Sequence, residues 1–305
     1  MSASNEQLRQ SIEQYVADRK AWLQEGLEIL GLDVYPEPTE VRADGEDLGL
    51  SADQEIAFRE VAGRFGLGGE VDVVSGARHQ IIEGGKPWKI EAEAAIADKA
   101  ETVIYAGSPH RIIGQDERDY LTTKYGAELP DQVSEYYAAV MIATNQKDFV
   151  ISESSVLPFG YDIDNGHTLV QEQTGQLVQM GTQNGRPVLA LRVDREDYED
   201  EEGNKKYRNQ PDSAALMGFI ADVLSATGDD VSSVGLNTSN TYASRAIDAV
   251  RAGLSRGRVF EVGMYGRETL AEIQGKPATE PTAINQIPGE LHAMSAKLSA
   301  LQAEL

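Results

Sequence analysis

The chain has 305 residues, 41% of them hydrophobic, which is enough for one large core with elaborations around it. Its formal net charge of −23 argues against binding to nucleic acid or to an anionic membrane, because both surfaces would repel it. Solubility is the plainer explanation of that charge. The absence of cysteine excludes disulfides, thiolate metal sites and cysteine nucleophiles.

We expect no signal peptide at the amino terminus. The stretch MSASNEQLRQ is polar and lacks the basic region and apolar stretch of a signal peptide. No apolar run approaches the roughly 18 to 20 residues that span a bilayer. We therefore expect a cytoplasmic protein.

Residues 1–70 are predicted to form a helical extension. Apolar side chains recur at helical spacing over residues 1–32, which indicates one amphipathic helix or two. A linker with two prolines follows. A second short helix fits residues 52–65, with Ser51 as the N-cap and Gly66 as the terminator.

Residues 71–275 are predicted to form an α/β domain. The apolar run at 71–74 is short, whereas TVIYA at 102–106 is a clearer strand that ends in a Gly-Ser-Pro turn. Helices are expected over 88–100 and 131–144. This mixture of predicted strands and helices differs from the helical extension and marks a domain boundary.

Residues 148–208 are predicted to be a strand-rich insert in that domain. The dipeptides Asn165-Gly166 and Asn184-Gly185 are typical of hairpins, because a type I′ turn needs positive φ at both central residues. PVLALRV at 187–193 is an almost continuous apolar strand, the pattern expected where both faces are covered.

Strands and helices alternate clearly after the predicted insert. Such alternation implies right-handed crossovers and a parallel sheet with helices on both faces. The expected helices lie at 213–224, 242–254 and 267–273, and the expected strands at 231–236 and 258–262.

Residues 276–305 are predicted to be a linker and a C-terminal helix. The helix has an apolar stripe at spacings of 3, 4, 3 and 4, made of Leu291, Met294, Leu298, Leu301 and Leu305. Packing onto the rest of the chain explains such a short stripe, and self-association as a homo-oligomer is the alternative.

Ligands of open parallel sheets bind in the crevice outside the carboxyl ends of the strands. The loops that follow the predicted strands are therefore the places to look for a site. Gly107 and Ser108 follow the strand at 102–106, with His110 close behind, and Asp194 follows the strand at 187–193.

The loop after the strand at 231–236 is the most informative of these. Short hydroxyl and amide side chains at this position can cap the next helix, and the free N–H groups of the helix can hold an anion. Capping needs only one such residue, whereas the loop offers five, namely Asn237, Thr238, Ser239, Asn240 and Thr241.

The loop at 263–267 follows the last predicted strand and contains Met264 and Arg267. A guanidinium there suits bidentate binding of a phosphate or a carboxylate. An ion pair with one of the many acidic side chains of the chain is the alternative.

Three stretches of the chain, taken in order, resemble the YdcF-like family. They are VIYAGSP at 103–109, TSNTYASRAIDAV at 238–250 and EVGMYGRETLAEI at 261–273. The family consists of Rossmann-like domains related to the bacterial envelope proteins SanA and ElyC. The resemblance places this chain's motif residues at Gly107, Asn240, Thr241, Met264, Arg267 and Thr269.

The resemblance implies a Rossmann-like sheet with a ligand pocket. One member of the family is associated with S-adenosylmethionine binding, and the envelope members handle lipid-linked precursors. The chain departs from the family pattern in its predicted insert and in Ala243-Ser244, where the family has a Glu-Asn pair.

Three further patterns are weak evidence for chemistry. Gly253 to Gly257 match G-x-S-x-G, but Ser255 follows a predicted helix, whereas a nucleophile elbow follows a strand. The acidic run at 196–202 lacks the spacing and the glycine of a calcium loop and is better explained as a solvated hairpin tip. The four histidines show no paired spacing for zinc.

We expect a protein that binds a small anionic or nucleotide-like molecule, with S-adenosylmethionine among the candidates. The sequence does not say whether a reaction follows. The alternative is a non-catalytic scaffold that self-associates through its terminal helices. A third and weaker hypothesis is a hydrolase that uses carboxylates such as Asp194 and Asp212.

Overall fold

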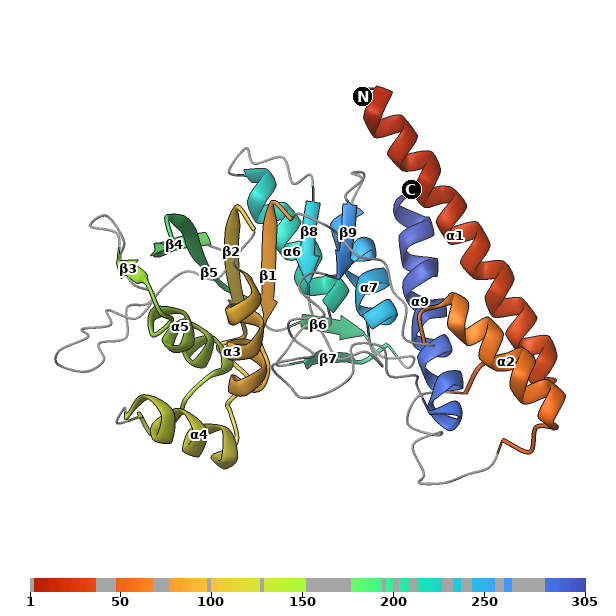
Figure 1. The fold of residues 1–305 in the computed structure, drawn as a ribbon, viewed down its shortest axis with the longest axis horizontal. Coiled ribbons are helices and arrows are strands. Elements are labelled where there is room, and N and C mark those ends of the chain that lie inside the picture. The colour runs from red at the N-terminus through yellow and green to blue at the C-terminus, as the bar shows by residue number, and fades with distance from the viewer. Residues whose placement is uncertain are drawn as a thin grey trace. The chain divides into compact units, whose positions relative to one another are not determined.

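A computed structural model describes most of the chain, which divides into two compact units (Figure 1). Unit 1 comprises residues 1–75 and 236–305, and unit 2 comprises residues 76–235. The described residues are 3–36, 48–67, 77–97, 100–126, 129–151, 177–193, 196–199, 203–208, 213–226, 233–236, 243–255, 261–264 and 283–305.

Unit 1 begins with two helices, as predicted. Helix α1 (Ala3–Leu30) is a single helix, and α2 (Ala52–Arg64) begins at a complete capping box in which the side chains of Ser51 and Gln54 bond each other's backbone. Gly66 follows α2 with φ of 75°, a value that glycine adopts without steric cost. The predicted cap and terminator of α2 are confirmed.

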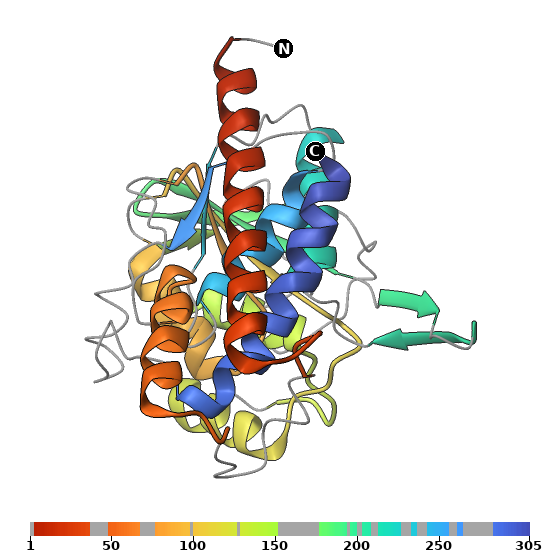
Figure 2. The same cartoon turned by 90° about the vertical axis from the view of Figure 1, so that its right-hand side faces the viewer.

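The rest of unit 1 is α7 (Ala243–Ser255), β9 (Glu261–Met264), the 3₁₀ turn η3 (Ile284–Gln286) and α9 (Ile287–Glu304). Helix α9 lies beside α1 and also packs against α7 (Figure 2). Four residues of its apolar stripe are completely buried, namely Leu291, Met294, Leu298 and Leu301, whereas Leu305 is half-buried. Packing within unit 1 therefore explains the stripe, and self-association through α9 stays a prediction.

Unit 2 contains a six-stranded sheet in the order β3-β4-β5-β2-β1-β8. Strands β1, β2, β5 and β8 pair in parallel, whereas β3 and β4 extend the sheet in antiparallel fashion beyond β5. The strands are β1 (His79–Glu83), β2 (Thr102–Gly107), β3 (Phe149–Ile151), β4 (Leu177–Gln183), β5 (Arg186–Arg192) and β8 (Ser233–Leu236).

Strand β1 is central and was not predicted. Its sequence HQIIE begins with two polar residues, His79 and Gln80, which are nonetheless buried. It has a parallel neighbour on each side, because Ile82 pairs with Tyr105 of β2 and His79 pairs with Val234 of β8. The strand predicted at 71–74 lies outside the described residues.

Helices cover both faces of these central strands. Helices α3 (Pro87–Ile96) and α5 (Glu135–Thr144) pack on the face with Ile82 and Tyr105, and α6 (Ser213–Ala226) lies on the opposite side (Figure 1). The predicted helices at 88–100 and 131–144 thus exist with shorter bounds. Helix α4 (Gln115–Tyr125) was not predicted, because its sequence QDERDYLTTKY has no apolar stripe.

The predicted insert needs a correction. The described part of residues 148–208 is strand-rich, but β5 is an integral strand of the sheet, because it pairs in parallel with β2, where Tyr105 is opposite Ala190, and in antiparallel fashion with β4. The hairpin at Asn184-Gly185 is confirmed, with φ of 51° and 79°. Asn165-Gly166 lies outside the described residues. Strands β6 (Glu196–Glu199) and β7 (Lys205–Arg208) form a separate antiparallel pair (Figure 2).

Some of the helices and strands predicted for the last part of unit 2 and for unit 1 are present. Strand β8 and helices α6 and α7 occupy the places predicted for the strand at 231–236 and the helices at 213–224 and 242–254. Strand β9 shares only residues 261–262 with the strand predicted at 258–262, and it includes Met264, which was predicted to lie in the following loop. The helix predicted at 267–273 lies outside the described residues. No helix in the described part of the chain has the length and apolarity to cross a membrane.

Candidate functional site

The carboxyl ends of β1, β2 and β5 lie next to one another at one edge of the sheet. The register sets this arrangement, since Glu83 is opposite Ala106 and Gly107 is opposite Arg192. We call this part of unit 2 the carboxyl edge. Each of the three strands brings a basic side chain to it or to the turn that follows, so the edge is the natural place to look for a ligand site.

The turn after β1 leads directly into α3 through Gly84-Gly85-Lys86, with Pro87 in the first turn of the helix. Proline fits this position because its missing N–H is not needed there and its φ suits a helix. Lys86 is exposed, and its backbone carbonyl accepts the first hydrogen bonds of α3. The sequence prediction missed this turn because it missed β1.

The turn after β2 is held tightly against α5. A Cβ atom at Gly107 would lie 2.9 Å from the Cα atom of Tyr136, so only glycine allows the strand and the helix to approach this closely. The carbonyl of Gly107 accepts from Val193 N–H, and that of Ser108 accepts from Tyr136 N–H. The structure therefore gives Gly107 a packing role, and its predicted contact with a ligand stays a prediction.

Glu135 lies close to the turn after β1 and bonds the turn after β2. Its buried carboxylate accepts from the backbone N–H of Ser108 at 3.3 Å and from the guanidinium of Arg111 at 2.6 Å. A Cβ atom at Gly84 would lie 2.7 Å from Cγ of Glu135, so the glycine makes room for this side chain. Glu135 thus fixes both turns at the carboxyl edge.

The start of α5 favours an acidic side chain at this position. Ser134 caps the helix by accepting from Tyr137 N–H at 3.1 Å, and Glu135 occupies the first turn, where the helix dipole stabilises negative charge. Burial nevertheless raises the pKa of Glu135 above its usual range, and the guanidinium of Arg111 opposes that rise.

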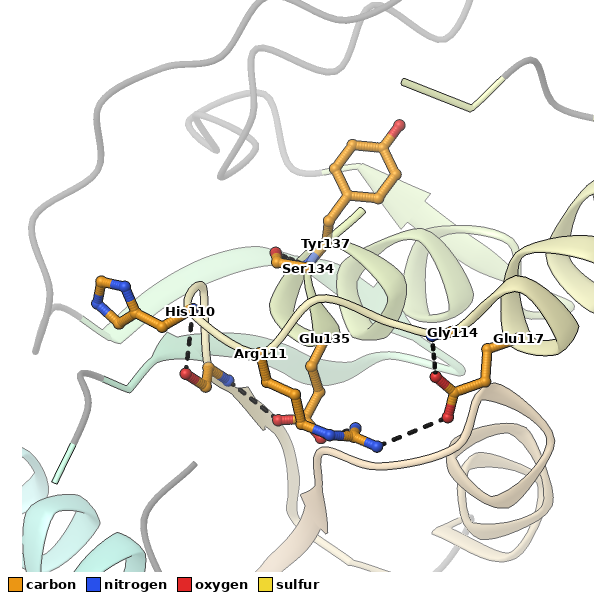
Figure 3. Close-up of polar contacts among 8 residues, drawn as sticks. His110, Arg111, Gly114, Glu117, Ser134, Glu135 and Tyr137 are labelled. Carbon is orange, nitrogen blue, oxygen red and sulfur yellow. Dashed lines mark hydrogen bonds and ion pairs between the residues drawn. The ribbon is translucent and has the colours of Figure 1, made fainter. Parts of the chain in front are cut away.

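Arg111 lies between two buried carboxylates. Besides Glu135, its guanidinium approaches Glu117 Oε1 at 3.6 Å, and the other carboxylate oxygen of Glu117 accepts from Gly114 N–H at 2.7 Å (Figure 3). The positive charge of Arg111 is therefore already balanced by the protein. Its main effect is to hold the turn after β2 to α4 and α5.

Lys89 and Glu93 form a second ion pair, one turn into α3. The Nζ atom of Lys89 lies 3.1 Å from Glu93 Oε1, and the Glu93 side chain is almost completely buried. Burial raises the pKa of Glu93 to about 7 against the opposing effect of Lys89. Burial also acts to lower the pKa of Lys89, but the carboxylates of Glu93 and Glu83 outweigh it and raise that pKa.

The structure brings three of the predicted site residues together, namely Gly107, Ser108 and His110. The backbone N–H of His110 donates to Ser108 Oγ at 3.2 Å, and its exposed imidazole points away from Arg111 (Figure 3). Met264 ends β9 in unit 1. The other predicted residues lie outside the described residues: Asp194, Asn237, Ser239, Asn240, Thr241 and Arg267.

Sequence reasoning missed Lys86, Lys89 and Glu135. Two signals in the chain could have found them. A glycine pair before a lysine and a proline marks a turn into a helix, and a glutamate directly after a serine marks a capped helix start. Both signals needed β1 and the true start of α5 to be recognised first.

These features define a mixed α/β protein with a mostly parallel sheet and a charged carboxyl edge. No family model, curated protein or solved structure matches the chain. The resemblance to the YdcF-like family therefore stays a prediction. No group of three or more His, Asp or Glu side chains among the described residues is arranged to hold a metal ion.

Proposed function

We propose that the protein is a Rossmann-like binding protein for a small anionic molecule, which it holds at the carboxyl edge of unit 2. The observation that carries this proposal is the position of β1. The chain continues from β1 to β2 on one side and reaches β8 on the other side only much later. Where neighbouring strands lead the chain in opposite directions, their loops separate and leave a crevice for a ligand.

The charges at the edge support an anionic ligand. The whole chain has a net charge of −23, yet Lys86 and His110 present exposed nitrogen-bearing side chains at the ends of β1 and β2. Arg111 and Lys89 are held by buried carboxylates, which leaves Lys86 as the exposed lysine best placed to meet a phosphate or carboxylate. Lysine binds phosphate as a point charge without needing a fixed geometry.

A second set of residues is predicted from the sequence alone to bind the same class of ligand. Asn237, Ser239, Asn240 and Thr241 come directly after β8 in the sequence, and their side chains are suited to hydrogen bonding with an anion. The guanidinium of Arg267 is suited to pairing with a phosphate or a carboxylate. The proposal does not include a reaction.

Mass spectrometry of small molecules released from natively purified protein tests the proposal directly. Isothermal titration with ATP, S-adenosylmethionine and inorganic phosphate then measures affinity. We expect Lys86→Ala to weaken anion binding about 10-fold, because it removes an exposed positive charge at the edge. The matched control is Lys205→Ala, an exposed lysine on β7. Equal affinities in the two variants, or no binding of any of these anions, would contradict the proposal.

A further inference from the structure

Trp88 is the unusual aromatic side chain of the carboxyl edge. It lies on the second residue of α3, directly after the Gly84-Gly85-Lys86 turn, and it is 38% exposed. Among the Phe, Tyr and Trp side chains whose burial the structure describes, it is the one that is exposed. Tryptophan gains much free energy from burial, and exposed tryptophan is enriched where a protein binds a partner or a ligand.

The indole of Trp88 is held in place by the ring of Tyr120. Its ring meets Tyr120 of α4 edge to face, with centroids 5.7 Å apart and an angle of 71° between the planes. Tyr120 is itself fixed, because its hydroxyl donates to Glu91 and accepts from Lys124. A ring that is fixed before a ligand arrives loses little entropy on binding, so it is a good stacking surface.

The ammonium group of Lys86 lies close to the Trp88 ring. The Nζ atom of Lys86 lies 5.1 Å from the centroid of the Trp88 ring, a cation–π contact at an exposed site. No carboxylate of the described residues forms an ion pair with Lys86, in contrast to Lys89 and Arg111. The flexible lysine stem can turn its ammonium group from the ring toward a neighbouring anion without any change in the backbone.

We propose that the ligand carries a planar aromatic base that stacks on Trp88 while its phosphate lies at Lys86, as in a purine nucleotide. This inference rests on the proposed function and names its ligand class. Bases stack on aromatic side chains through their π faces, and every nucleobase has such a face. A ring beside a cation therefore selects for a molecule that has both a base and a negative charge.

Fluorescence of the full-length chain tests the stacking. The protein contains two tryptophans, so Trp22→Phe leaves Trp88 as the one indole that reports. In this variant we expect ATP to quench the emission and to protect Trp88 from acrylamide. Adenosine should do the same at about 10-fold higher concentration, because it lacks the phosphates. Inorganic triphosphate should bind without quenching.

Substitution of Trp88 separates the two proposals. We expect Trp88→Ala to weaken ATP binding about 10-fold or more in calorimetry, and Trp88→Phe to restore most of the affinity because it keeps a flat ring. Affinity for inorganic triphosphate should stay unchanged in both. Circular dichroism confirms that each variant is folded. If ATP and triphosphate bind equally well and Trp88→Ala changes neither, stacking is wrong and anion binding stands. If ATP, adenosine and inorganic triphosphate all fail to bind, the proposed function itself is wrong.

Discussion

Two regions of the molecule handle positive charge in opposite ways. In unit 1, the guanidinium of Arg19 is 3.6 Å from the carboxylate of Asp248 and lies over the ring of Tyr15 at 3.6 Å. The centroids of the Trp22 and Phe65 rings lie 5.7 and 5.9 Å from the same guanidinium. Asp248 is completely buried and also accepts from the hydroxyl of Tyr15 at 2.5 Å. We call these residues the aromatic charge cluster.

At the carboxyl edge of unit 2, basic side chains reach solvent instead. Lys86 and His110 are exposed, and even Arg111, which is paired with two carboxylates, keeps 29% of its side chain accessible. The presence of an ion pair therefore does not by itself show whether a basic side chain serves the fold or binds a ligand. A guanidinium enclosed by rings has its partners already and contributes to the fold, whereas an exposed lysine at strand ends can exchange water for a ligand.

The largest effect is expected from breaking the aromatic charge cluster. Asp248→Ala leaves Arg19 buried without its carboxylate, and removing one partner of a buried ion pair typically costs about 3–5 kcal/mol. Urea denaturation measures the free energy of unfolding. The double variant Arg19→Met, Asp248→Leu removes both charges and should recover much of that loss. A stable Asp248→Ala variant that has lost ATP binding would instead make this cluster a ligand site.

A smaller effect is expected from pH, through Glu93. The pKa of this carboxyl is about 7 in the folded protein, above the value of 4.5 that it has when free, because burial disfavours the charged form. Between these values the folded state binds more protons than the unfolded state, so stability falls as pH rises from about 4.5 to 7. The loss is on the order of 3 kcal/mol.

Glu93→Gln is the variant that tests this pH dependence, because its amide has the same shape and does not titrate. The free energy of unfolding of this variant, measured in urea at pH 5 and pH 8, should change less than that of the wild type. Glu60→Gln, at an exposed position of α2, is the matched control because it removes a carboxyl group that is not buried. A wild-type protein as stable at pH 8 as at pH 5 would argue against a buried, proton-holding Glu93.

The smallest effect is expected from Gly84→Ala at the carboxyl edge. The new Cβ would overlap the Glu135 side chain, and we expect a loss of about 2 kcal/mol in unfolding free energy. Gly63→Ala is the matched control, since Gly63 lies within α2 with no atom near its Cβ position and should gain up to about 1 kcal/mol. A Glu135→Ala background should relieve the overlap, so additive losses would show that the two residues do not meet.

Elements with strong local signals could be predicted from the sequence. The cap at Ser51, the turn at Asn184-Gly185 and the apolar strand at 187–193 each depend on chemistry within a few residues, and each is present. The stripe on α9 also predicted a helix, although only the structure shows that α1 and α7 cover it.

The missed elements lack such signals for physical reasons. Strand β1 buries His79 and Gln80, whose polarity hides the strand pattern, and α4 has so few apolar residues that no helical stripe appears. The candidate site depends on contacts between segments far apart in the chain. Glu135 meets Ser108 across 27 residues, and no pattern in a single sequence reveals that contact.

The division of the chain has a consequence for synthesis on the ribosome. Unit 1 is assembled from both ends of the chain, so α1 emerges long before α9, the helix whose Gln302 bonds Lys20. Because translation adds about 5–20 residues per second, the apolar side of α1 waits on the order of ten seconds or more for its partner. During that interval the residues of α1 that pack on α9 lack this partner, whereas the intervening unit 2 can already fold.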